Sequence, residues 1–357
     1  MKISPLIQFY TSKPTLKNDK KQSVQCPVNS YSTKLSAENY SANFMPNFTS
    51  LKFTEGENNF CDTHFFRDYE TLEKAAQILK RNFPSGTDIL DFASSNGEEA
   101  ISLYAILNNG KNAKYKILCF DKSQNIVDLA NKGVYTVYNR CAEDRYLLYE
   151  NPDSGTTKDI IKYFNNIMEE TGKPAHQIND EFFISVLTNL CNLCDDDFKI
   201  KYYKIKDDYK NNFEFNVGDI NDIENLYPEK QAGAILFRNA FYIPTHNLAL
   251  NEYDVKVRTD INKQEIIDNI VDKVYEKLQP GGLFIMGDNE KDHVFLADEI
   301  LTDAESLFIP SYFAVIYKYP PVYKALTRNN RFKPVHEKTI DSAIGKMQIF
   351  TIWQKNK

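Results

Sequence analysis

ILDFASSNGEEAI, residues 89–101, is the stretch that decides the fold of this chain. Its first five residues predict a buried strand, residues 94–97 a short polar turn, and the residues from about Glu98 an amphipathic helix. A strand that ends in a turn of small residues leaves the first N–H groups of the next helix pointing at whatever lies above the strand's carboxyl end. Because Gly97 has no Cβ, a ligand can approach the backbone there closely. The stretch therefore predicts a ligand-binding turn in an α/β protein.

Apolar segments on both sides of this stretch predict the rest of a sheet. Further buried strands are predicted at 116–120, 213–217, 233–237 and 283–287. Helices with one apolar face are predicted to end at about Arg81, to run from Ser123 to Lys132, and to run from about Lys263 to Leu278. Two C-terminal segments, 312–318 and 347–353, are expected to pair as antiparallel strands. Strands that alternate with helices predict a Rossmann-like, doubly wound and mostly parallel sheet, whose ligand lies at the strands' carboxyl ends.

The pattern also predicts how the chain is divided. Residues 1–55 are rich in Ser, Asn, Lys and Thr without a lasting period, which predicts a flexible N-terminal arm. The remaining residues, 56–357, are expected to form one domain. Within it, residues 134–212 interrupt the strand pattern, and structureless loops of that length are uncommon, so an inserted subdomain is expected. Its predicted elements are helices at about 159–168 and 181–193 and a strand at 198–205.

Composition excludes several classes of protein. The 357 residues carry 43 basic and 49 acidic side chains, a net charge of −6, and no basic block is paired with an aromatic stripe, which argues against nucleic acid as the main partner. No apolar run reaches the roughly 18 to 20 residues of a membrane-spanning helix, and the first residues lack a secretory signal, so we expect a cytoplasmic protein without membrane insertion. The CxxC of Cys191 and Cys194 lacks a second ligand pair, which predicts reduced thiols and no metal site.

Polar residues follow the predicted core strands and would meet at one edge of the sheet. Asp121 ends the second strand at about the distance of one βαβ unit, where an acid can bind a ribose diol. The residues after the next three strands are Asp219 and Ile220, then Arg238 and Asn239, then the GDNE segment at 287–290. This set fits a nucleoside, while the absence of GxGxxG argues against a pyrophosphate. An adenosine without phosphates points to S-adenosylmethionine (SAM).

Six motifs stand in a characteristic order along the chain. They are THFFRDYETL (63–72), FASSNGEEAISL (92–103), CFDKSQNIVDLANKGVY (119–135), FEFNVGDI (213–220), ILFRNAFYI (235–243) and LQPGGLFIMGDNE (278–290). Together they resemble the CheR-type chemotaxis-receptor methyltransferases of the class I SAM-dependent superfamily. The resemblance implies transfer of a methyl group from SAM to glutamate side chains of a protein acceptor, such as the cytoplasmic region of a chemoreceptor, with S-adenosylhomocysteine (SAH) as the product.

The resemblance also implies roles for individual residues. Thr63 and Arg67 would close over the cofactor and the reacting carboxylate, and Glu99 would contact the methionine moiety. The other cofactor-binding residues would be Asp121 at the ribose, Asp219 and Ile220 at the adenine, Ala93, Ser94 and Gly97 in the turn, and Arg238 and Asn239 on the methyl-transfer side.

The chemistry agrees with this assignment. Methyl transfer from a sulfonium to a carboxylate is an in-line displacement that neutralises opposite charges, so it needs alignment and desolvation more than a strong base. An arginine such as Arg67 can hold a carboxylate through two parallel hydrogen bonds, which makes orientation its expected role. The candidate catalytic residues are Arg67, Arg238 and Tyr242.

Structural roles are the competing interpretation of the same residues. Asp121 could serve only as an acid at a helix N-terminus, and Arg67 could form a surface ion pair with Asp68 or Glu70. Arg238 and Asn239 could simply cap the turn that follows them. In the company of the other motifs, we favour the ligand-binding roles.

The sequence departs from the family pattern near the acceptor. The family has a Tyr five residues after the Arg of FRN, where this chain has Ile243, and Tyr242 stands one place earlier. The helical domain that usually precedes FFRD is replaced by about 60 polar residues. Two alternatives therefore stay open: a SAM-dependent methyltransferase with another protein or small-molecule acceptor, and a non-catalytic module that binds SAM or SAH. An ordered β-hairpin within 198–212 would favour the receptor-type acceptor, since the family uses a β-subdomain there for docking.

Overall fold

The computed structural model describes residues 63, 65–109, 114–140, 155–172, 198–241, 249–251, 254–256, 263–288, 321–342 and 345–356. Three of the predicted elements lie outside these residues: the arm at 1–55, the helix at 181–193 and the strand at 312–318.

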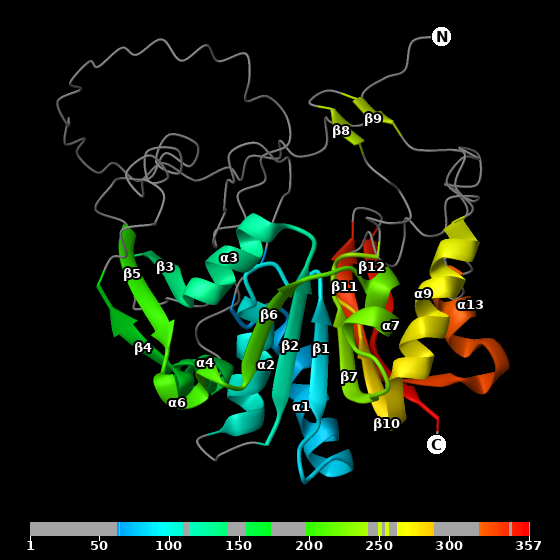
Figure 1. Cartoon of the computed structure of the whole chain (residues 1–357), viewed down its shortest axis with the longest axis horizontal. Coiled ribbons are helices and arrows are strands. Elements are labelled where there is room, and N and C mark those ends of the chain that lie inside the picture. The colour runs from blue at the N-terminus through cyan, green and yellow to red at the C-terminus, as the bar shows by residue number, and fades with distance from the viewer. Residues whose placement is uncertain are drawn as a thin grey trace, which may run out of the picture. The chain divides into compact units, whose positions relative to one another are not determined.

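A seven-stranded sheet is the centre of the described part of the chain (Figure 1). Its strands are β1 (Asp88–Phe92), β2 (Lys116–Asp121), β6 (Phe213–Val217), β7 (Ala232–Phe237), β10 (Leu278–Ile285), β11 (Phe332–Ser342) and β12 (Gly345–Lys355). They lie in the order β11-β12-β10-β7-β1-β2-β6, and only β12 runs antiparallel to its neighbours in this sheet. The five strands that come first in the chain, β1, β2, β6, β7 and β10, thus follow the doubly wound order. One half of the sheet extends from β1 and the other from β7. The prediction of a mostly parallel, doubly wound sheet with an antiparallel C-terminal pair is confirmed.

The last strand, β12, contains the predicted segment 347–353 and pairs with β10 on one edge and with β11 on the other. Its predicted partner, 312–318, lies outside the described residues. The sequence FKPVHEKTIDS of β11 hides this strand, because it has Pro334, several charges and shifts of register at His336 in place of an apolar run.

Two hydrophobic clusters cover the two faces of the sheet. Helices α1 (Tyr69–Asn82) and α2 (Glu98–Asn108) pack on one face, and α7 (Ile223–Leu226), α9 (Lys263–Lys277) and α13 (Pro321–Thr327) pack on the other. In β1, Ile89 belongs to the first cluster and Leu90 to the second. Strands that are buried on both faces read as continuous apolar runs, which is why the sequence revealed them.

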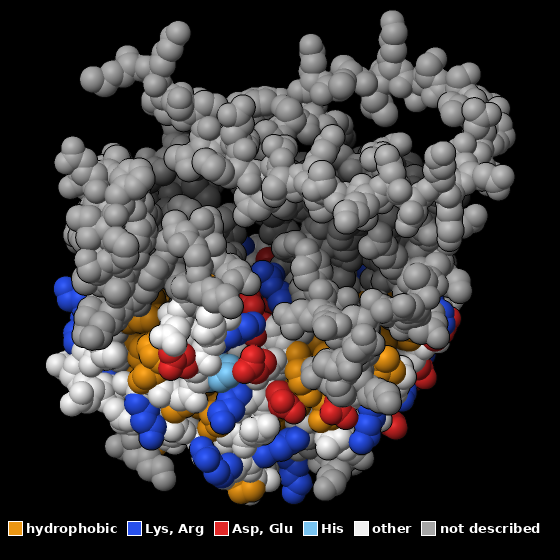
Figure 2. All heavy atoms as spheres, turned by 180° about the vertical axis from the view of Figure 1, so that it is seen from behind, with side chains coloured by type: hydrophobic (Ala, Val, Ile, Leu, Met, Phe, Trp, Pro, Cys, Tyr) orange, Lys and Arg blue, Asp and Glu red, His pale blue; other side chains and the backbone are white. Residues whose placement is uncertain are grey.

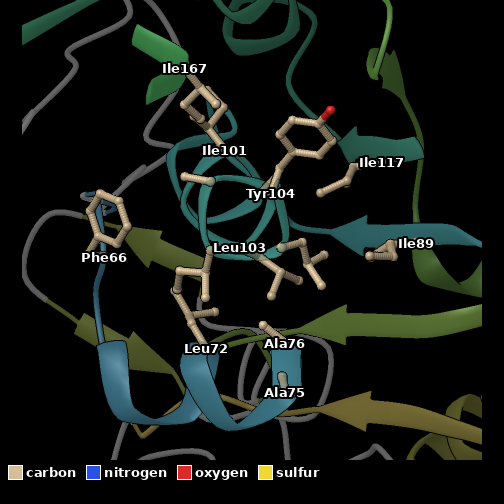
Figure 3. Packing of buried hydrophobic residues seen from close by; sticks show 14 of the residues in the cluster. Phe66, Leu72, Ala75, Ala76, Ile89, Ile101, Leu103, Tyr104, Ile117 and Ile167 are labelled. Atoms are coloured by element: carbon tan, nitrogen blue, oxygen red, sulfur yellow. The ribbon is translucent and has the colours of Figure 1, made fainter. Parts of the chain in front are cut away.

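Helix α2 is buried around its whole circumference, whereas the sequence predicted an amphipathic helix. All eleven of its residues are buried, including Glu98 and Glu99. In Figure 3, Ile101 and Tyr104 of α2 lie between two sets of residues. Ile89 and Ile117, which belong to strands of the sheet, lie on one side, and Ile167 lies on the other. Ile167 ends α4 (Gly155–Ile167), a helix of the inserted segment that packs on α2. The insertion therefore covers the face of α2 that an amphipathic helix would expose.

The inserted segment forms a second, three-stranded antiparallel sheet in the order β3-β5-β4 (Figure 1). Its strands are β3 (Val134–Arg140), β4 (Met168–Thr171) and β5 (Phe198–Ile205). The predicted helix near 159–168 and the predicted strand at 198–205 are confirmed as α4 and β5. No hairpin lies within 198–212, because β5 is the central strand and the short helix α6 (Asp207–Lys210) follows it.

The remaining described elements complete this picture. Helix α3 (Gln124–Lys132) packs on β2 and β6, the short helix η3 (Ile220–Asp222) follows β6, and β8 (Ala249–Asn251) pairs with β9 (Asp254–Lys256). Among the described helices, none combines the length and apolar character needed to cross a membrane. Figure 2 shows acidic and basic side chains interspersed on the described part of the face opposite to that of Figure 1.

Candidate active site

The candidate site lies where the two halves of the sheet diverge. β1 pairs with β2 on one side and with β7 on the other, and the three strands run in the same direction. The chain leaves β1 through the turn at 93–97 and enters α2. In open α/β sheets, ligands bind beyond the carboxyl ends of the strands at this switch point.

The turn after β1 is strained and firmly held. Ala93 and Ser95 adopt left-handed φ values of 56° and 51°. Such backbone conformations cost about 1–3 kcal/mol each and persist where the surroundings impose them. Here the N–H of Ser94 donates to the carbonyl of Phe120 over 3.1 Å, and the N–H of Ser95 donates to Oδ2 of Asp121 over 2.9 Å. The end of β2 thus fixes the turn in a conformation suited to a site.

Gly97 is required by packing as well as by backbone conformation. Its φ is 87°, and a Cβ at this position would lie 2.3 Å from Cε1 of Phe215 in β6. The sequence argument explained this glycine by close approach of a ligand. The structure places an aromatic ring of the protein there instead.

Asp121 joins the ends of two strands to the start of α3. Oδ1 accepts the N–H of Ser123 over 3.0 Å, while Oδ2 accepts the N–H of Ser95. Burial raises the pKa of Asp121, and these backbone hydrogen bonds act against the shift. The structural role considered above is therefore real. Since each carboxylate oxygen can accept two hydrogen bonds, acceptor capacity also remains for a diol.

Asp219 and Ile220 lie close to Asp121, because Val217 of β6 pairs in register with Asp121 of β2. Oδ1 of Asp219 accepts the backbone N–H of Asn221 over 2.8 Å, and its Oδ2 forms an ion pair with Lys122. Ile220 is buried in the second hydrophobic cluster. Both residues thus stand at the predicted place, where Asp219 also caps η3.

Arg238 is the centre of a buried ion-pair network. Its Nη1 lies 3.1 Å from Oε2 of Glu99, and its Nη2 lies 3.3 Å from Oδ2 of Asp68 and donates to the carbonyl of Arg67 over 3.2 Å. Burial alone would lower the pKa of Arg238, but the carboxylates of Glu99 and Asp68 overcome this and raise it. Burial also raises the pKa of Glu99, against the opposing charge of Arg238. Arg238 therefore connects three distant segments of the chain.

The turn at 65–68 is anchored on two sides. Phe66 and Asp68 adopt left-handed φ values of 57° and 52°, and the N–H of Phe66 donates to Oγ of Ser102 in α2 over 2.8 Å. The ring of Phe65 packs edge-on against Tyr135 and Phe164 of the inserted segment. The turn therefore holds Arg67 at the crevice, where its charge acts on Glu99 and Asp288.

The Asp68 carboxylate, considered above as a surface partner of Arg67, is buried and contacts Arg238 and Lys338. Lys338 Nζ donates to Oδ1 of Asp68 over 2.7 Å and to Oδ2 of Asp288 over 2.9 Å. Asp68 and Asp288 belong to two of the quoted motifs, so they could have been suspected. Lys338 lies in β11, for which the sequence showed no strand pattern, so no sequence signal pointed to it.

Asp91 is a further residue that the sequence analysis missed. It lies within β1, opposite Cys119 of β2, and it is buried. Burial, followed by the charge of Glu99, raises its pKa well above the ordinary value. An acidic residue inside an otherwise apolar strand is an available signal, since such residues are seldom buried without a reason.

Of the remaining predicted residues, some lie in the described part of the chain and others lie outside it. Thr63 is buried, and Asn239 has a φ of 54° and packs so closely that a Cβ on Gly287 would lie 2.0 Å from its Oδ1. Arg238 and Asn239 therefore contact segments distant in sequence. Tyr242 and Ile243 lie outside the described residues. The described residues contain no group of His, Cys, Asp and Glu that could hold a metal ion.

The polar atoms around the turn fit an amino-acid group. Four buried atoms near it have no hydrogen-bond partner within the described protein: Asp91 Oδ2, Ser95 Oγ, Asn96 Oδ1 and Arg238 Nε. They comprise donors and acceptors close together, as recognition of an ammonium and a carboxylate requires. The methionine moiety of SAM carries both groups, so these residues fit it.

Comparison with known families agrees with this geometry. Residues 61–201 match the profile of the CheR methyltransferase, SAM-binding domain. This segment is similar to the SAM-binding domain of CheR methyltransferases. The match covers the turns at 65–68 and 93–97, Glu99 and Asp121, as well as much of the insertion. SAM is thus the cofactor, and the chain is a SAM-dependent methyltransferase.

Other comparisons give weaker similarities. No curated protein matches the chain. An O-methyltransferase from Bacillus cereus in complex with SAH is 12% identical over 80% of this chain and 81% of its own, with a TM-score of 0.33. A SAM-dependent methyltransferase from Methanosarcina mazei is 13% identical over 78% of this chain and 97% of its own, with a TM-score of 0.32. The fold of this chain is therefore assigned from its own strand order.

Proposed function

We propose that this methyltransferase is a protein-glutamate O-methyltransferase of the chemotaxis-receptor type. The observation that carries the proposal is the Arg238 network, which unites the FFRD turn, the GEE turn and the FRN segment through Glu99 and Asp68. These are three of the motifs on which the resemblance rests. Their convergence at the switch point of the sheet supports a shared role in one reaction.

The cofactor would lie across the carboxyl ends of β1, β2 and β6. Glu99 and the unsatisfied atoms of the turn would hold its methionine moiety, and Asp121 would accept the ribose hydroxyls. Ile220 and Asp219 would border the adenine, with Thr63 closing the site from the 65–68 side. When bound, SAM supplies an electrophilic methyl group on a sulfonium.

The charge of the site favours a carboxylate as acceptor. Glu99, Asp68 and Asp288 supply three carboxylates, and Arg238, Lys338 and Arg67 supply three cations that act on them. SAM would add one net positive charge to this balanced group. A carboxylate would neutralise that charge, whereas a hydroxyl acceptor would leave it and would also need a base. Arg67 would orient the acceptor carboxylate.

The inserted sheet supports a protein acceptor. Its central strand β5 is paired on both edges, while β3 and β4 form the two outer strands of the three. Outer strands present backbone N–H and C=O groups to which an extended peptide can pair. The family resemblance assigns this region to docking, and a chemoreceptor segment would be the partner.

The test is transfer of a labelled methyl group to chemoreceptor cytoplasmic fragments from the same organism. Glutamyl methyl esters release volatile methanol in alkali, and mass spectrometry of the untreated acceptor would locate them. We expect base-labile label on glutamates, absent when those glutamates are replaced by alanine, and a large loss of rate with Arg67→Ala. Label on a small hydroxyl compound but on no protein would overturn the glutamate proposal. SAH binding without any transfer would favour a binding module.

A further inference from the structure

Lys338 links two acidic side chains that come from distant parts of the chain. Its ammonium lies 2.7 Å from Oδ1 of Asp68 and 2.9 Å from Oδ2 of Asp288, and its side chain is only 15% exposed. Asp68 is fully buried at the start of α1, and Asp288 follows β10. Lys338 itself belongs to β11, outside the segment that matches the CheR family. A third element thus reaches the candidate site.

The two carboxylates need this cation. Burial and the negative charge of Asp288 raise the pKa of Asp68, while Arg238 and Lys338 act against the rise. Burial also acts to raise the pKa of Asp288, but Lys338 overcomes it and the net shift is downward. Without Lys338, two desolvated acids would face each other with one fewer positive charge. Such an arrangement favours protonation of one acid or capture of another cation.

Asp68 transmits this effect to the cofactor side. While its Oδ1 accepts from Lys338, its Oδ2 faces Nη2 of Arg238, and Nη1 of Arg238 faces Glu99. The chain of contacts therefore runs from β11 through Asp68 and Arg238 to the first turn of α2. It also fixes the turn at 65–68, whose last residue is Asp68.

We propose that Lys338 is a positioning residue of the SAM site, which binds Asp68 and Asp288 together and thereby keeps Arg238 on Glu99 and the 65–68 turn over the cofactor. This rests on the cofactor placement proposed above and not on the identity of the methyl acceptor.

The proposal predicts a pH dependence that a purely structural lysine would not produce. Lys338 is one of the groups that lower the pKa of Asp68 and of Asp288, so Lys338→Met should raise both pKa values. A rising pH then favours two carboxylates that face each other without the ammonium between them, so the loss of cofactor affinity in the variant should grow with pH. The charged and titratable groups around Asp68 are Arg67 in its own turn, Glu70 and Lys74 of α1, Glu99 of α2, Arg238 after β7, Asp288 after β10, and His336 and Lys338 of β11. All except Lys338 are shared by wild type and variant, so the substitution acts directly only on the titration of the two acids that Lys338 contacts, Asp68 and Asp288.

The experiment is calorimetric titration with SAH between pH 6 and 8.5, together with thermal unfolding of the ligand-free protein. We expect Lys338→Met to weaken SAH binding about tenfold at the upper end of this pH range, within the usual range for coupled sites, and the loss to become smaller as the pH falls. Its unfolding temperature should fall increasingly as the pH rises. Lys338→Arg should retain most affinity, and Lys338→Met combined with Asp288→Asn should recover it by removing the second acid. Lys333→Met, an exposed lysine of the same strand, is the matched control and should leave binding unchanged.

Three results would overturn the proposal. The first is wild-type affinity of Lys338→Met at every pH. The second is a loss that is independent of pH and is not relieved by Asp288→Asn, which would mark Lys338 as structural only. The third is a wild-type protein that binds no SAH, which would overturn the cofactor placement as well. Absence of glutamate methylation, in contrast, would leave this test intact. If Lys338→Met alone does not fold, SAH binding of Lys338→Arg and of Lys338→Met combined with Asp288→Asn is compared with that of the wild type instead.

Discussion

The two sides of the candidate site are held by different forces. On the side proposed to bind the ribose, backbone N–H groups of Ser95 and Ser123 hold Asp121, and the contacts join residues near the ends of adjacent strands. On the side proposed for methyl transfer, Arg238, Glu99, Asp68 and Lys338 hold one another through side-chain ion pairs between distant segments. Backbone contacts tolerate changes in single side chains, whereas a buried ion-pair network fails when one member is lost. The transfer side should therefore be the more sensitive to mutation.

The largest effect is expected for Arg238→Met. This change leaves Glu99 and Asp68 buried without their shared cation, so the free energy of unfolding should fall by about 3–5 kcal/mol. Urea unfolding measures it. Arg328→Met is the control, because Arg328 pairs with Asp268 and Asp272 but is 36% exposed, and a loss below about 1 kcal/mol is expected. Equal losses of the free energy of unfolding in the two variants would show that the buried network is no more sensitive than an exposed ion pair.

The next effect is expected for Gly97→Ala on the ribose side. The left-handed backbone and the overlap with Phe215 together should lower the free energy of unfolding by about 2–4 kcal/mol. Phe215→Ala in the same chain should relieve only the overlap. A double-mutant cycle by urea unfolding separates the cost of the backbone strain from the cost of the overlap. If Phe215→Ala restored the whole free energy of unfolding that Gly97→Ala had removed, backbone strain would contribute nothing.

A third test concerns Asp121 itself. Asp121→Ala removes a charged acceptor, so SAH affinity should fall at least about tenfold, as loss of a hydrogen bond to a charged group usually costs about 1.5–3 kcal/mol. Calorimetry measures it. Asp128→Ala on the exposed face of α3 is the control and should bind as wild type. Unchanged affinity of Asp121→Ala would leave the acid with its structural role alone.

The smallest effect is expected for Lys122→Met. Lys122 pairs with Asp219 next to the proposed adenine position, but its side chain is 67% exposed. Exposed ion pairs contribute little, so the free energy of unfolding should change by less than about 0.5 kcal/mol. A loss as large as that expected for Arg238→Met would show that exposure does not distinguish the two sides.

The same contrast decides what could be predicted from the sequence. The positions of Asp121 and Asp219 were predicted correctly, because each lies at or just after the end of a strand whose apolar run is visible. Asp121 and Asp219 needed only the rule that parallel strands end at one edge. The methyl-transfer side needed tertiary contacts. Arg238 was identified by family resemblance, but its partners Asp68 and Glu99 could not be derived from spacing.

Two other failures have the same origin. The helix α2 was expected to have a polar face, but α4 packs on this helix and the 65–68 turn binds its Ser102 through the N–H of Phe66. The strand β11 was missed because Pro334 and its charges mask the period, so Lys338 had no predicted position at all. In each case a segment distant in sequence determines the environment.

The origin of Lys338 in β11 also sets the order in which the site is assembled during synthesis. The ribosome produces Asp68, Glu99 and Asp121 first and Arg238 and Asp288 later, while Lys338 emerges near the end. A prematurely terminated chain can therefore contain the whole segment that matches the CheR family and still lack the cation that balances its buried acids. We expect such truncated products to bind cofactor poorly, so that methyl transfer is confined to chains whose C-terminal strands have been made.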